Sequence, residues 1–263
     1  MTQTDSAKLG HARDALERHV WTEAYEGLAA IDRDGMLAPE DLERLAEAAW
    51  WAAHPRESLD AFERAHAAHV AAGNPERAAF IALRLVDECF ERHEAALANG
   101  WLQRARRLLE DLPEGPVHGN LELELVRSEM IRGEPEEAIE HARKGREIGT
   151  RYGERDLEAV GMVLEGVLLV RQAMVERGLS LVDEAMAAAV GGELTPYAGG
   201  NVYCITMAAC RSVSDYRRAG EWTEAAARWC ERQAITGFPG VCRVHRAEVM
   251  RIRGALPQAE DEA

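Results

Sequence analysis

The sequence has no long apolar run. Its longest apolar stretch, residues 160–170, is interrupted by Gly161, Glu165 and Gly166. A membrane-spanning helix needs roughly 18 to 20 apolar residues in succession. Residues 1–5 have neither the basic nor the apolar region of a secretion signal. We therefore expect a protein that makes no membrane contact and resides in the cytoplasm.

Catalytic signatures are also missing. The sequence contains no G-x-S-x-G, no H-E-x-x-H and no glycine-rich phosphate loop. Its many carboxylates stand at solvated helix positions beside basic residues. We therefore assign no catalytic residue and no cofactor, and we interpret the chain as non-catalytic.

Basic charge is scarce as well. The chain has 31 lysine and arginine residues against 46 aspartate and glutamate residues, a formal net charge of −15. A nucleic-acid-binding protein normally presents a basic face, because phosphate contacts supply much of its affinity. The local cluster of Arg104, Arg106 and Arg107 alternates with acidic residues at helical spacing. We expect no direct binding of nucleic acid.

What the sequence does contain is a repeat of about 40 residues. Small residues that open a helix-like run recur at spacings of 34, 40, 40, 40, 41 and 40 residues, at Ala24, Ser58, Ala98, Ala138, Gly178, Ala219 and Ala259. Such a period is typical of a chain built from stacked copies of one supersecondary unit. The residues four positions later are predicted to face a neighbouring helix: Leu28, Phe62, Leu102, Ala142, Val182 and Thr223.

Each repeat reads as two helices joined by a short turn. Ala, Leu, Glu and Arg dominate, and apolar residues recur three or four positions apart. Pro55 fits the first turn of a helix, and the segments 73–75 and 133–135 read as turns. No segment shows sustained period-two alternation, so we predict no strand. The expected fold is all-α, a solenoid of antiparallel helix hairpins similar to tetratricopeptide (TPR) repeats.

We expect residues 1–263 to form a single superhelical domain. It would hold six complete hairpins and a truncated seventh, in which a full helix over 241–253 is followed only by residues 257–263. An array normally ends in a capping helix with a polar outer face. We therefore expect a fragment of a longer protein, and a homodimer that completes the last hairpin is the alternative.

Several segments carry a pattern known from signalling proteins. They include LVDEAMAA at 181–188, GELTP at 192–196, DYRRA at 215–219, EWT at 221–223 and RWC at 228–230, together with 21–25, 42–50, 202–204 and 240–248. They resemble the helical TPR-like region of actinobacterial multidomain proteins. There the region accompanies a LuxR-type helix-turn-helix, a nucleotide cyclase or a cyclic-nucleotide-binding domain.

This resemblance covers nearly the whole chain and implies a role in regulation. It implies a protein-interaction and signal-sensing module of a LuxR-type transcriptional regulator. The alternative is a regulatory scaffold attached to, or partnering, a nucleotide cyclase. The chain itself contains no helix-turn-helix and no cyclase sequence, so the resemblance supplies no activity for it.

Aromatic and basic residues gather in the last two repeats. Such side chains suit an anionic or aromatic ligand or an acidic peptide. We predict a groove for a protein or peptide partner, or for a small anionic effector, formed by Tyr203, Arg228, Trp229, Arg243, His245 and Arg246. The alternative is packing between repeats, in which the arginines pair with nearby glutamates.

Metal binding is a third interpretation. Cys242 and His245 are three residues apart and so share a helix face, and Cys204 and Cys230 lie in helices expected to pack nearby. No paired C-x-x-C motif supports a site, and cysteine often packs as a small buried residue. We assign no metal ligand. The odd number of cysteines, five, favours reduced thiols over a disulfide framework.

His66 and His69 form a second histidine pair at helical spacing, after Glu63. We expect them on a partly exposed helix face. A weak transition-metal pair is the alternative.

Overall fold

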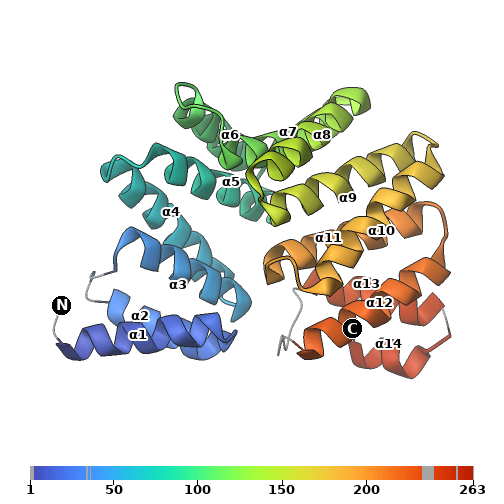
Figure 1. The fold of residues 1–263 in the computed structure, drawn as a ribbon. Helices are drawn as coiled ribbons and strands as arrows, with labels where there is room; N and C mark the ends of the chain where they lie inside the picture. Colours follow the sequence, from blue (N-terminus) through green and yellow to red (C-terminus); the bar gives the residue numbers. More distant parts are fainter. Residues whose placement is uncertain (1–2, 34, 36, 233–239, 253, 263) are drawn as a thin grey trace. The chain divides into compact units, whose positions relative to one another are not determined.

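The computed structural model describes residues 3–33, 35, 37–232, 240–252 and 254–262. Every regular element among these residues is an α-helix, which confirms the predicted all-α fold (Figure 1). Contacts divide the chain into two compact units, Met1–Pro113 and Glu114–Ala263. The single continuous domain expected from the sequence stays a prediction.

Among the described residues, six helices belong to the first unit and eight to the second. The first unit contains α1 (Gln3–Glu17), α2 (Trp21–Asp32), α3 (Pro39–Trp51), α4 (Pro55–Ala71), α5 (Pro75–Glu91) and α6 (Ala95–Leu109). The second contains α7 (Pro116–Arg132), α8 (Pro135–Tyr152), α9 (Arg155–Arg171), α10 (Val175–Gly191), α11 (Pro196–Ser212), α12 (Tyr216–Arg232), α13 (Gly240–Ile252) and α14 (Leu256–Glu262). Six of these helices begin with proline, whose fixed φ and missing N–H suit the first helical position.

Each even-numbered helix packs against the odd-numbered helix before it, so every repeat is a helix hairpin (Figure 1). The small residues that mark the repeat in the sequence fall at the fourth position of α2, α4, α6, α8, α10, α12 and α14, and all seven are buried. The six residues predicted to face a neighbouring helix are buried too. A small side chain at the fourth position lets the two helices of a hairpin approach closely.

The turn inside each hairpin has the same backbone conformation in every repeat. The residue two positions before each even-numbered helix has a positive φ: His19, Ala53, His93, Gly133, Ala173, Ser214 and Gly254. The following amide closes the turn by donating to a carbonyl five residues earlier, as from Met174 to Leu169 at 2.9 Å. This is the Schellman ending of a helix, for which glycine is the preferred residue.

Replacing Ala173 with glycine should therefore stabilise the second unit by about 1 kcal/mol, because alanine is strained at a φ of 63°. Urea unfolding measures the change. The matched control is Ala187→Gly at an exposed position inside α10, which should lose about 1 kcal/mol. A loss of stability from Ala173→Gly would contradict the described turn.

The core of each unit is made by the inward faces of its helices. In the first unit Leu28, Phe62, Ile81 and Leu85 belong to one buried cluster. In the second unit buried Leu123, Ile148 and Leu157 gather between α7, α8 and α9. The stripes of apolar residues three and four positions apart are thus what holds successive hairpins together.

Candidate functional site

The sequence-predicted groove residues fall into three groups. Tyr203 in α11 is 1% exposed and Trp229 in α12 is 4% exposed. The hydroxyl of Tyr203 lies 3.1 Å from that of Thr223, so Tyr203 takes part in packing α11 against α12. Arg228, next to Trp229, is exposed. The side chains of Arg243, His245 and Arg246 lie outside the described residues, and the groove as a whole stays a prediction.

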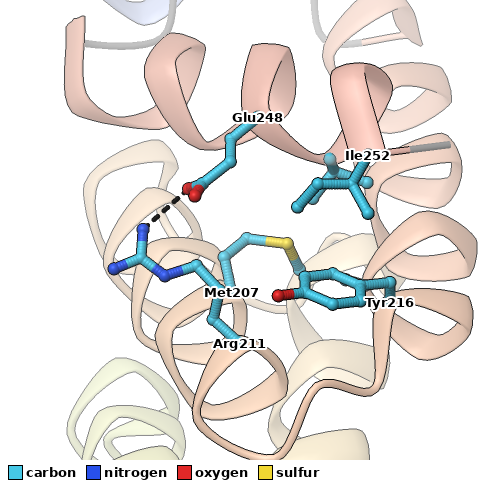
Figure 2. A pocket seen from close by; sticks show the side chains of 7 residues that line it. Met207, Arg211, Tyr216, Glu248 and Ile252 are labelled. Carbon is cyan, nitrogen blue, oxygen red and sulfur yellow. Dashed lines mark hydrogen bonds and ion pairs between the residues drawn. The ribbon is translucent and has the colours of Figure 1, made fainter. Parts of the chain in front are cut away.

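A small cavity lies beside these residues, between α11, α12 and α13 (Figure 2). Met207, Tyr216 and Ile252 line it, and Arg211 pairs with Glu248 at 2.7 Å across one edge (Figure 2). Its free volume is only about 10 Å³, which is room for one water molecule at most. The cavity is therefore a packing gap and not a ligand site.

A larger hollow opens on the surface of α10 and α12. Its free volume is about 550 Å³, and it is lined by Asp183, Glu184, Arg217, Arg218, Glu221, Trp222 and Ala225. These residues come from two successive repeats, from the even-numbered helix of each. A hollow of this size accommodates side chains of a peptide or a small molecule.

Asp183 organises the floor of this hollow. Its carboxylate accepts a hydrogen bond from the indole Nε1 of Trp222 at 2.8 Å and is paired with the guanidinium of Arg218. The Nε of Arg218 also donates to Asp215 at 3.0 Å. The backbone N–H of Arg218 and its side chain both donate to Asp215 and lower the pKa of that carboxyl. The indole and one guanidinium are thus held in fixed positions.

The rim of the hollow is open to solvent. The side chain of Arg217 is 75% exposed and pairs with Glu221 at 2.7 Å, and Glu184 is exposed as well. Exposed pairs of this kind contribute little to stability. A ligand can therefore bind either partner with only a small loss of free energy from breaking the pair. The hollow therefore offers an apolar ring and charges of both signs.

Comparisons with known proteins identify the fold but no family. No protein-family model matches the chain, and no curated protein matches it. Among solved structures, one similar protein is a signal transduction ATPase with numerous domains (STAND) from Pyrococcus horikoshii that has a tetratricopeptide repeat sensor, with a TM-score of 0.55 and 14% identity over 98% of this chain. The fold is TPR-like. The chain spans 40% of the length of that STAND protein.

Two further solved structures show the same TPR-like fold. A kinesin light chain-like protein of Podosopora anserina with nearly identical TPR-like repeats aligns with a TM-score of 0.50 and 14% identity, over 73% of this chain and 99% of its own. BtubC (BKLC) from P. vanneervenii aligns with a TM-score of 0.51 and 16% identity, over 90% of this chain and 94% of its own. None of the described helices is long and apolar enough to cross a lipid bilayer.

The hollow on the TPR-like hairpins was not predicted from the sequence, although a signal for it exists. Asp183 and Trp222 are 39 residues apart, close to one repeat period. Residues one period apart lie at similar heights on neighbouring hairpins. A search for complementary polar residues at that separation would have found the pair.

The histidine pair on α4 corrects an expectation. His66 and His69 are buried, 6% and 2% exposed, and not on a partly exposed face. The Nδ1 of His66 lies 2.9 Å from the carbonyl oxygen of Ala78, and the Nε2 of His69 lies 2.6 Å from a carboxylate oxygen of Glu43. Burial lowers the pKa of His66, so its neutral ring donates to the carbonyl. Partners on α3 and α5 account for the burial.

Within the described part of the chain, no three His, Cys, Asp or Glu side chains gather as a metal site would require. Cys89 and Cys210 carry buried, free thiols. Cys204 is disulfide-bonded, which corrects the expectation of reduced thiols at that position.

The thiol of Cys210 should be unreactive in the folded protein. Burial raises its pKa to about 12, and only the thiolate is nucleophilic. At pH 8 we expect iodoacetamide to modify it about a thousandfold more slowly than in urea, as read by mass spectrometry of the tryptic peptide. Equal rates in the two conditions would contradict its burial.

Proposed function

We propose that this chain is a non-catalytic protein-interaction and signal-sensing module. The hollow on α10 and α12 carries the proposal. It combines a half-buried indole with charges that are open to solvent. Aromatic rings and arginines are the side chains that contribute most to protein interfaces.

The chemistry of the hollow favours a peptide segment as the ligand. Arg217 suits a carboxylate of the partner, Trp222 an apolar or cationic side chain, and Glu184 a basic group. A segment that bears these three kinds of side chain would bind across both hairpins. Because α10 and α12 belong to successive repeats, the bound segment would favour one packing of these hairpins over others.

The same proposal includes the type of regulatory protein in which this module acts. The segments 181–188 and 215–223, which supply most of the hollow's lining, also carry the resemblance to the TPR-like region of LuxR-type regulators. The STAND protein of similar fold has a tetratricopeptide repeat sensor. We propose a cytoplasmic sensor whose partner changes the state of an attached DNA-binding domain. A regulatory scaffold beside a nucleotide cyclase is the second candidate.

The gene distinguishes these two settings. Reading the genomic frame on both sides of the codons for residues 1–263 should reveal a helix-turn-helix domain in the same polypeptide. A cyclase domain there would support the scaffold instead. A frame that encodes neither domain would contradict the LuxR-type setting and leave the interaction module to be tested by binding.

Binding at the hollow is tested with peptides. A displayed library of random peptides is selected against the whole chain, and hydrogen exchange is measured with and without the strongest peptide. The proposal expects slower exchange in the fragments that cover α10 and α12. Protection only elsewhere, or no peptide that binds more tightly than about 100 μM, would contradict it.

A further inference from the structure

Three arginines converge on one buried carboxylate in the second unit. Glu165 of α9 is 0% exposed. The NH2 group of Arg146 lies 3.0 Å from its Oε2, while Arg143 Nε and Arg177 NH2 lie 3.5 and 3.9 Å from its Oε1. Arg143 and Arg146 come from α8 and Arg177 comes from α10. Guanidinium groups from α8 and α10 thus lie together beside this carboxylate.

Within the described part of the chain, these arginines pair with two carboxylates. All three pair with Glu165, and Arg143 also pairs with the exposed Glu140 at 2.9 Å. Neither oxygen of Glu165 accepts a hydrogen bond from the described residues, and the buried Nε of Arg146 donates none. Each guanidinium has five N–H donors. The carboxylate of Glu165 therefore holds the arginines together, while most of their donors make no hydrogen bond to the described residues.

Arg177 stands at a helix position where three other repeats have a glutamate. It is the third residue of α10, and the third residues of α2, α4 and α8 are Glu23, Glu57 and Glu137. An acid there is favoured by the positive end of the helix dipole, and an arginine is not. In α12 the third residue is again an arginine, Arg218, but two aspartates neutralise it. In α10 the acid of the first turn is the neighbouring Glu176, and Arg177 lies instead beside Glu165 of α9.

The cluster is open to solvent on its outer side. The side chains of Arg143 and Arg146 are 33% and 28% exposed, and that of Arg177 is 64% exposed. In a chain with a net charge of −15, three guanidinium groups thus gather around one buried carboxylate. Planar guanidinium groups match the oxygens of a phosphate in pairs.

We propose that Arg143, Arg146 and Arg177 bind a phosphate monoester at the amino-terminal end of α10, with Glu165 as the residue that positions them. The same dianion is offered by a small phosphorylated metabolite and by a phosphorylated side chain of a peptide. The site uses none of the residues that line the hollow on α10 and α12, so it does not rest on the proposed function.

Titration calorimetry of the whole chain at low ionic strength tests the site. The probes are phenyl phosphate, a phosphoserine peptide and the same peptide without phosphate. Arg177→Glu should weaken binding of both phosphorylated probes at least tenfold, and Arg143→Gln is a second variant that keeps most of the side-chain length. The matched control is Arg155→Glu, an equal charge change at an exposed position at the start of α9, which should alter affinity less than twofold.

The results distinguish a specific phosphate site from attraction by net charge. Equal affinity of wild type and Arg177→Glu for both phosphorylated probes, with Arg143→Gln also unchanged, would overturn the site. An equal loss in Arg155→Glu would do the same, because it would show attraction by net charge alone. If phenyl phosphate binds as tightly as the phosphopeptide, the phosphate group alone is recognised and the natural ligand is a small phosphorylated molecule. Binding of the phosphopeptide ten times more tightly supports a phosphorylated partner.

Discussion

Replacing Gly178 with alanine should lower the free energy of unfolding of the second unit by about 2 to 3 kcal/mol. A methyl group at this position would lie 2.5 Å from the carbonyl oxygen of Gly166 and 2.8 Å from the backbone nitrogen of Val170. Both are backbone atoms, so α9 and α10 would have to separate. The better helix propensity of alanine offsets only about 0.5 to 1 kcal/mol of this cost.

The matched control for Gly178→Ala is Gly100→Ala in α6, where an added methyl group meets no atom within 4 Å. There the same substitution should raise stability by up to about 1 kcal/mol. Urea unfolding measures both changes, and hydrogen exchange locates them in α9–α10 and α6. A gain of stability from Gly178→Ala would contradict the close approach of α9 and α10.

Replacing Asp41 with asparagine should cost the first unit about 2 to 3 kcal/mol at pH 7. Asp41 is 1% exposed and accepts bonds from Arg13 Nε at 2.8 Å, Arg13 NH2 at 2.6 Å and Arg44 NH1 at 2.9 Å. Neutralising the carboxylate leaves these guanidinium groups without their counter-charge. This loss of unfolding free energy is at the low end for a buried ion pair, because both arginines are partly exposed.

The pH dependence of this effect has a definite sign. Burial alone would raise the pKa of Asp41, but the bonds from Arg13 and Arg44 outweigh it and lower the pKa below its ordinary value of 3.8. The carboxylate therefore stabilises the fold fully above about pH 4. This contribution is lost as the pH falls through the lowered pKa of the folded state.

Urea midpoints at pH 7 and between pH 4 and pH 2 measure this difference. The gap between wild type and Asp41→Asn should shrink as the pH falls over the lower range. The control is Asp60→Asn, since Asp60 is 67% exposed and pairs with Arg64 at 3.2 Å, and it should cost less than about 0.5 kcal/mol. A gap that is the same at every pH would contradict the ionised state of Asp41.

The repeat was predictable because packing imposes a periodic requirement on the chain. A small residue at the fourth position of each second helix is needed in every hairpin, so Ala98, Ala138 and Gly178 recur at constant spacing. Helix starts were predictable for a local reason as well, since Pro55 opens α4. What is repeated or local can be read from one sequence.

Contacts particular to one repeat were not predictable in this way. His66 was expected on a partly exposed face, yet it is buried against the carbonyl of Ala78 on the next helix. Glu165 stands in an apolar stretch, and nothing near it in the sequence indicates that Arg143 of α8 and Arg177 of α10 both approach it. Such clusters depend on how neighbouring hairpins are packed, which the composition of a helix does not reveal.

The most direct test of the interaction module is the affinity of a selected peptide for Trp222→Ala, measured by titration calorimetry. The indole provides the apolar surface of the hollow on α10 and α12, so its removal should weaken binding at least tenfold. The control is Trp101→Ala in the first unit, where a half-buried tryptophan packs on the edge of His66, and it should change the affinity less than twofold. Equal affinity of the peptide for wild type and Trp222→Ala would contradict the proposal that partners bind at this hollow.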